Sequence, residues 1–161
     1  MKSVSLSFLR SSVSARLTIG FPQDRRKLIN DAFREQLYEY VGGTLRGHKG
    51  HLIEIGGVED HVHLLANLSP VLAVADVIRN VKANASKWVN ELPRKREKFN
   101  WKVGYSAFSV SYSGIEPVCD YIRNQQEHHR TVTFKEEYIQ FLERHGIGFD
   151  SSRLFEDEHV G

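Results

Sequence analysis

Residues 51–68, with the sequence HLIEIGGVEDHVHLLANL, decide the fold, because they predict two strands joined by a short connection. Segments 51–55 and 61–68 are dominated by aliphatic and β-branched residues, which favour strands. The segment between them, 56–60, combines two glycines with two acidic residues and is typical of a turn. We therefore expect a β-hairpin whose returning strand begins at His61.

Elements on both sides of the hairpin complete the fold. Before the hairpin we expect a strand over 15–21 ended by Pro22, and then a helix from Asn30 or Asp31 to Val41 ended by Gly42 and Gly43. After the hairpin we expect a helix beginning at Ser69 and Pro70, and then a strand over 105–111. Two further helices follow, one from the capping box 113–116 to about Arg130 and a short one from the capping box 133–136 to Gly146. This order predicts an α+β fold of the ferredoxin-like βαββαβ type, an antiparallel sheet with helices on one face, followed by a C-terminal helix. Dimerisation could cover its exposed sheet edge.

Length and composition predict one globular domain. The chain has 161 residues, of which 40% are hydrophobic and 26% charged, both ordinary values. We expect an N-terminal extension over 1–12, one domain over 13–150 and a tail over 151–161. A membrane span needs about 20 apolar residues and no run approaches this, so no membrane partner is expected. Cys119, the single cysteine, fits a cytoplasmic location.

Charge gives a local rather than a global indication of nucleic-acid binding. The net charge is only +2, but basic residues cluster before the aromatic residues Phe99 and Trp101. Such a cluster can hold a phosphate backbone while bases stack on rings, although a solvated loop has the same pattern. The candidate DNA contacts are Arg25, Arg26, Arg79, Lys82, Arg94, Lys95 and Arg96.

His61 and His63 are candidate metal ligands. In a strand, alternate side chains share a face, so both imidazoles should point the same way. The same alternation aims Asp60 away from them. A pair of surface histidines is the alternative. A nucleotide hydrolase of the histidine-triad type would have a third histidine at position 65, which is Leu65.

Tyr121 and Gln125 are one helical turn apart and should lie on one face of their helix. A buried face should be apolar, but here Gln125 lies between Tyr121 and His129 on a face that comprises Ile115, Val118, Tyr121, Ile122, Gln125 and His129. Burying an amide without a partner costs about 1–3 kcal/mol, so Gln125 needs a hydrogen bond or a polar site. A metal held by His61, His63 and Gln125 would account for all three polar residues. Mg²⁺ or Mn²⁺ suits these ligands, and Zn²⁺ stays open.

Tyr121 would then be a nucleophile, since a nearby cation can orient a phosphate for in-line attack by a phenol. A core aromatic with its hydroxyl at the rim is the alternative. His128 and His129 follow on the same helix, where DNA contact, tuning of the site and surface positions all stay open.

Three segments resemble a known family: IGGVEDHVHLL (55–65), FNWKVGYSAFSVS (99–111) and YIRNQQEHHR (121–130). They resemble the single-tyrosine transposases of small bacterial insertion sequences, including relatives associated with repeated palindromes, in the His-hydrophobe-His superfamily of single-strand DNA nucleases. The likeness covers about residues 14–150. At 22–25 the chain has PQDR, where relatives often carry a lysine and then an arginine.

The resemblance implies a homodimer with a divalent metal, Mg²⁺ or Mn²⁺, held by His61, His63 and Gln125. Tyr121 would cleave single-stranded DNA beside a hairpin, leaving a 5′-phosphotyrosine and a 3′-hydroxyl that can rejoin a new end, in the bacterial cytoplasm at the nucleoid. A hairpin-binding protein of the same fold without transposition is the alternative. An RNA-binding domain is disfavoured, because 51–55 and 61–68 contain no aromatic residue.

Overall fold

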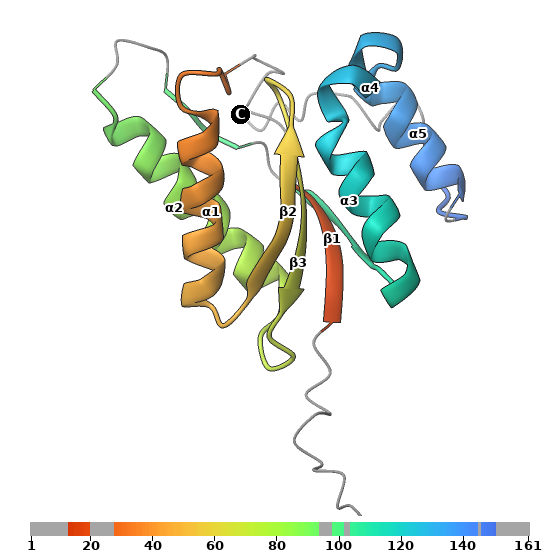
Figure 1. The fold of residues 1–161 in the computed structure, drawn as a ribbon, viewed down its shortest axis with the longest axis horizontal. Helices are drawn as coiled ribbons and strands as arrows, with labels where there is room; N and C mark the ends of the chain where they lie inside the picture. Colours follow the sequence, from red (N-terminus) through yellow and green to blue (C-terminus); the bar gives the residue numbers. More distant parts are fainter. Residues whose placement is uncertain (1–12, 20–27, 94–97, 102–103, 145, 151–161) are drawn as a thin grey trace, which may run out of the picture.

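The computed structural model describes residues 13–19, 28–93, 98–101, 104–144 and 146–150 (Figure 1). The predicted extension 1–12, the tail 151–161 and the candidate DNA contacts Arg25, Arg26, Arg94, Lys95 and Arg96 lie outside the described residues. The elements are β1 (Val13–Ile19), α1 (Arg34–Gly47), β2 (His51–Gly57), β3 (Val62–Leu68), α2 (Val74–Glu91), β4 (Tyr105–Ser109), the 3₁₀ turn η3 (Tyr112–Gly114), α3 (Ile115–Arg123), α4 (Gln125–Thr131) and α5 (Phe134–Arg144).

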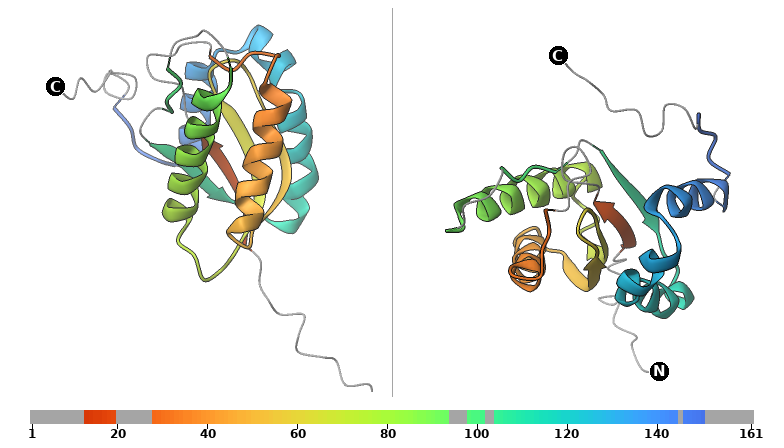
Figure 2. Two further views of the ribbon diagram at one scale, coloured as in Figure 1. Left: turned by 90° about the vertical axis from the view of Figure 1, so that its left-hand side faces the viewer. Right: turned by 90° about the horizontal axis from the view of Figure 1, so that it is seen from above.

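The sheet has the strand order β2-β3-β1-β4, and every neighbouring pair is antiparallel. Helices α1 and α2 cover one face, and α3, α4 and α5 lie on the other (Figure 2). The predicted ferredoxin-like βαββαβ arrangement is therefore confirmed, with the additional C-terminal helices on the second face. No helix among the described residues is both long enough and apolar enough to cross a membrane.

Strand β3 is buried on both faces. Val62, Leu64 and Ala66 belong to the main core formed with α1 and α2. Leu65 belongs to a second, smaller core with Cys119 and Ile122 of α3. Because side chains alternate along a strand, His63 shares the face of Leu65 and is turned towards α3.

Three boundaries of α1 and α2 differ from those predicted. Helix α1 begins at Arg34 rather than at Asn30 or Asp31, and Asn30 Oδ1 accepts from the Ala32 N–H in the turn before it. Helix α1 continues through Gly42 and Gly43 to Gly47. Gly42 does not terminate the helix but faces β2, where a Cβ atom would lie 3.3 Å from the end of the flexible Leu52 side chain. Ser69 and Pro70 do not begin α2, which starts at Val74. They form a turn in which the Leu72 N–H donates to the Ser69 carbonyl at 3.3 Å.

The predicted helix 113–130 is two helices. The first capping box is wrong: 112–114 form a 3₁₀ turn, and α3 begins at Ile115 without a side-chain cap. The chain then breaks at Asn124 (φ −93°, ψ 14°). The Asn124 side chain donates to the Asp120 carbonyl at 2.8 Å and competes with helical hydrogen bonding, which explains the break.

The second capping box is confirmed. The Thr133 N–H donates to Glu136 Oε2 at 2.8 Å, and the Glu136 N–H donates to Thr133 Oγ1 at 3.3 Å. The hydrogen bond that the Glu136 carboxylate accepts from the Thr133 N–H holds the pKa of this carboxyl group below its ordinary value. After α5, Gly146 adopts a positive φ of 63°, as a helix-terminating glycine commonly does.

We predict that Gly56→Ala destabilises the protein, because a Cβ at Gly56 would lie 2.4 Å from the Ile122 carbonyl oxygen of α3. Overpacking against backbone costs about 1–3 kcal/mol. Gly42→Ala is the matched control, since its nearest neighbour is the end of the flexible Leu52 side chain. The midpoint of urea unfolding should fall for Gly56→Ala and change little for Gly42→Ala. Equal midpoints for both variants would contradict this close approach of α3 to β2.

Candidate active site

The structure brings His61, His63, Tyr121 and Gln125 together between β3 and the helices α3 and α4. His61 is 0% exposed, His63 2% and Gln125 1%. The His61 and His63 rings are 4.9 Å apart between centroids, and the Tyr121 ring lies 5.6 Å from that of His63. Gln125 Nε2 donates to the Tyr121 carbonyl at 3.4 Å, which turns Gln125 Oε1 the other way.

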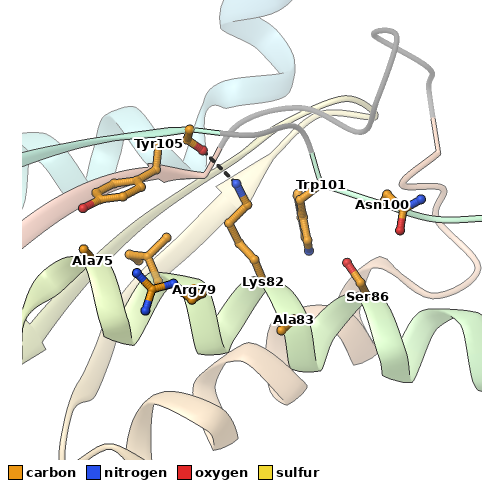
Figure 3. A pocket seen from close by; sticks show the side chains of 10 residues that line it. Ala75, Arg79, Lys82, Ala83, Ser86, Asn100, Trp101 and Tyr105 are labelled. Atoms are coloured by element: carbon orange, nitrogen blue, oxygen red, sulfur yellow. Dashed lines mark hydrogen bonds between the residues drawn. The ribbon is translucent and has the colours of Figure 1, made fainter. Parts of the chain in front are cut away.

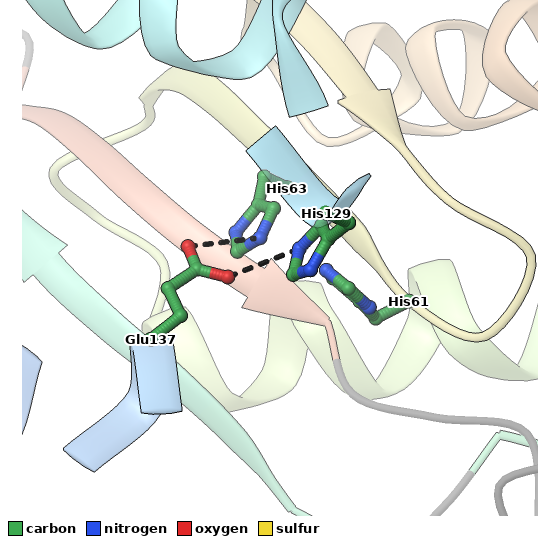
Figure 4. A group of neighbouring side chains, drawn as sticks. All are labelled: His61, His63, His129 and Glu137. Carbon is green, nitrogen blue, oxygen red and sulfur yellow. Dashed lines mark ion pairs between the residues drawn. The ribbon is translucent and has the colours of Figure 1, made fainter. Parts of the chain in front are cut away.

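Two further residues, His129 and Glu137, complete the cluster. Ligand atoms of His61, His63, His129 and Glu137 all lie within 4.8 Å of one another. Figure 4 shows the Glu137 carboxylate of α5 reaching towards His63 and His129. The distances are 3.8 Å from His63 Nε2 to Glu137 Oε1 and 3.1 Å from His129 Nε2 to Glu137 Oε2. The sequence placed His129 on the right face of its helix, but no spacing linked it to Glu137.

Asp60 supports His61, contrary to the expectation that it points away. His61 Nδ1 lies 2.7 Å from Asp60 Oδ1. Both residues precede β3, so strand alternation does not apply to them. Burial alone would raise the pKa of Asp60, but the hydrogen bond and charge of His61, with a smaller effect of His129, keep it below its ordinary value. The carboxylate can therefore accept the Nδ1 proton, and in the neutral ring the lone pair would then be on His61 Nε2.

The hydrogen bonds of His129 test whether the site fits a cation. His129 Nδ1 lies 3.0 Å from the Val132 carbonyl, which can only accept, so Nδ1 carries the proton. Burial, followed by the charge of His61, lowers the pKa of His129, which favours the neutral ring. His129 Nε2 lies 3.1 Å from both Gln125 Oε1 and Glu137 Oε2. An imidazole nitrogen, an amide oxygen and a carboxylate oxygen thus meet at one point, and this donor set fits a bound divalent cation.

A cavity of about 600 Å³ opens beside the cluster, lined by His61, His129, Asp60 and Glu59 together with Arg34 and Arg130. This cavity gives a ligand access to an otherwise buried group of imidazoles.

A second cavity, of about 510 Å³, lies between α2 and the segment that leads to β4 (Figure 3). Two predicted DNA contacts, Arg79 and Lys82, line it beside Trp101 and Tyr105. Lys82 Nζ donates to the Gly104 carbonyl at 2.8 Å, and burial lowers the Lys82 pKa. The lining combines cations with aromatic rings.

Comparisons with known proteins agree with this fold. Residues 13–125 match the family described as "Transposase IS200 like". No curated protein matches the chain. A candidate transposase of Deinococcus radiodurans R1 has a similar structure, with a TM-score of 0.57, 18% identity, and 71% of this chain and 91% of that chain covered.

A REP-associated tyrosine transposase bound to a REP hairpin is similar over 93% of both chains, with a TM-score of 0.58 and 13% identity. At these identities the two structures support the fold alone. The family match covers most of the chain, however, and on that ground the protein belongs to the IS200-like transposases.

Proposed function

We propose that this transposase is a metal-dependent single-strand DNA endonuclease and strand transferase that uses Tyr121 as its nucleophile. The observation that carries the proposal is the position of Tyr121, whose ring contacts His63 beside the buried cluster of imidazoles. A solved protein of similar fold is bound to a REP hairpin. We therefore propose a single strand next to a DNA hairpin as the substrate.

In the proposed reaction, Tyr121 Oη attacks the phosphorus in line with the 3′-oxygen. The bond to the 3′-oxygen breaks, leaving a 5′-phosphotyrosine and a free 3′-hydroxyl. The proton lost by the phenol balances the proton gained by the leaving oxygen. A 3′-hydroxyl from another end can attack the phosphotyrosine and regenerate Tyr121. An ordinary phenol has a pKa of about 10, so Tyr121 needs help to lose its proton. His128, whose ring lies 5.5 Å from the Tyr121 ring, is the proposed acceptor.

His61, His63 and Gln125 would hold Mg²⁺ or Mn²⁺. When bound, a divalent cation would polarise the phosphate and offset its negative charge. Asp60 holds His61 with its Nε2 lone pair available for such an ion. Carboxylates behind metal-binding histidines commonly serve this purpose.

The remaining parts of the proposal concern DNA and assembly. Arg79 and Lys82 would contact phosphates at the second cavity, with Trp101 as a stacking surface for a base. Strand β4 lies at the edge of the sheet, and pairing through this edge would form the homodimer. We propose that the protein acts in the bacterial cytoplasm, at the nucleoid.

We predict that Tyr121→Phe abolishes a covalent protein–DNA adduct, because phenylalanine lacks the attacking oxygen. Single-stranded DNA carrying a hairpin from the flanks of the gene is incubated with Mg²⁺ or Mn²⁺ and resolved on a denaturing gel. Tyr112→Phe is the control, since Tyr112 is 93% exposed. The wild type and this control should form the adduct only with metal.

Two outcomes would contradict this proposal. An adduct that persists in Tyr121→Phe would place the nucleophile elsewhere. Hairpin binding by the wild type without any adduct, under either metal, would support the binding-only alternative.

We further predict that Lys82→Gln weakens binding of the hairpin DNA by roughly three- to tenfold and lowers the slope of log Kd against log salt concentration by about one. Lys87→Gln is the control, because Lys87 lies on the same helix, is 76% exposed and pairs with Glu91. Fluorescence anisotropy at several salt concentrations measures both effects. If the two variants bound DNA equally well, the second cavity would not be part of the DNA interface.

A further inference from the structure

We propose that His129 and Glu137 are ligands of the same ion as His61 and His63, which makes the centre a site of three imidazoles and one carboxylate for a transition metal such as Zn²⁺ or Mn²⁺. The inference rests on the proposed function in one respect, namely that this site holds a divalent ion. It extends that function by adding two ligands and by naming the class of metal.

Distances within the cluster suit a shared ion. Ligand atoms that each lie about 2.1 Å from one ion are roughly 3–4 Å apart. His129 Nε2 lies 3.1 Å from Glu137 Oε2, and His63 Nε2 lies 3.8 Å from Glu137 Oε1. Gln125 Oε1, at 3.1 Å from His129 Nε2, can join the same coordination sphere.

The imidazoles of His61 and His129 are each oriented by an acceptor that faces their Nδ1 atom. The Nδ1 atoms of His61 and His129 face Asp60 and the Val132 carbonyl. This arrangement turns each Nε2 towards the cluster. Metal-binding histidines in proteins are usually held in this way by an acceptor on the second nitrogen.

A simple ion pair between Glu137 and protonated His129 is the alternative. The side chains of both residues are only 11% exposed, and burying such a pair costs desolvation of both charges. A metal ion bound by the His61 and His129 imidazoles and the Glu137 carboxylate would stabilise all three groups without a proton on either ring.

The donor set also selects the metal. Three nitrogen atoms and one carboxylate suit Zn²⁺ or Mn²⁺, whereas Mg²⁺ prefers oxygen ligands. Both added ligands lie beyond residue 125, where the family match ends. An ion bound by Glu137 would join α5 to β3, so metal binding should also protect α5 from opening.

The test compares metal binding by the full chain with that of Glu137→Gln, after removal of metal with a chelator. Glu143→Gln is the matched control, because Glu143 is an exposed residue of the same helix. Isothermal titration with Zn²⁺, Mn²⁺ and Mg²⁺ should give one ion per chain, bound most weakly as Mg²⁺. We expect Glu137→Gln to bind Zn²⁺ and Mn²⁺ at least tenfold more weakly and Glu143→Gln to match the wild type.

Hydrogen–deuterium exchange provides a second readout and shows whether each variant is folded. Zn²⁺ should slow exchange of α5 amides in the wild type and in Glu143→Gln, but not in Glu137→Gln. Unchanged affinity and unchanged α5 protection in Glu137→Gln would overturn the added ligand while leaving a site of His61, His63 and Gln125. A wild type that binds no metal would overturn this inference together with the metal-dependent part of the proposed function.

Discussion

Burial of β3 on both faces is the constraint on which the rest of the site depends. One row of its side chains, including Leu64 and Ala66, packs on α1 and α2. The other row starts at His63 and continues with Leu65, which packs against α3. A buried imidazole loses its contact with water and must find polar partners in the protein. The partners of His61 and His63 therefore come from every segment that packs on this face, namely the loop before β3 and the helices α3, α4 and α5.

Close packing and polar chemistry are linked at one glycine. Gly56 lets the backbone of α3 approach β2 at Ile122, one residue after Tyr121. Gln125, the first residue of α4, follows three residues later and turns its amide oxygen to His129. The proposed nucleophile and the proposed metal ligands thus depend on the same contact between helix and sheet. A change that moves α3 would displace both.

Much of the fold and part of the site could be predicted from the sequence. The hairpin, the βαββαβ order and the proximity of His61, His63, Tyr121 and Gln125 follow from strand alternation, helical spacing and the family resemblance. The predictions failed where tertiary contacts override local pattern. Gly42 lies inside α1, where it faces Leu52 of β2, rather than at its end. Asn124 interrupts the predicted helix, because its side chain donates to the Asp120 carbonyl. Glu137 was missed because only the fold brings α5 to β3.

The central claim is that a metal ion binds between β3 and the tyrosine helix. The most direct measurement is anomalous X-ray diffraction from crystals of Tyr121→Phe soaked with Mn²⁺ and bound to single-stranded DNA. The account predicts one manganese peak within coordination distance, about 2.2 Å, of His61 Nε2 and His63 Nε2, with a DNA phosphate beside residue 121. A peak elsewhere, or DNA bound away from this face of the sheet, would contradict it.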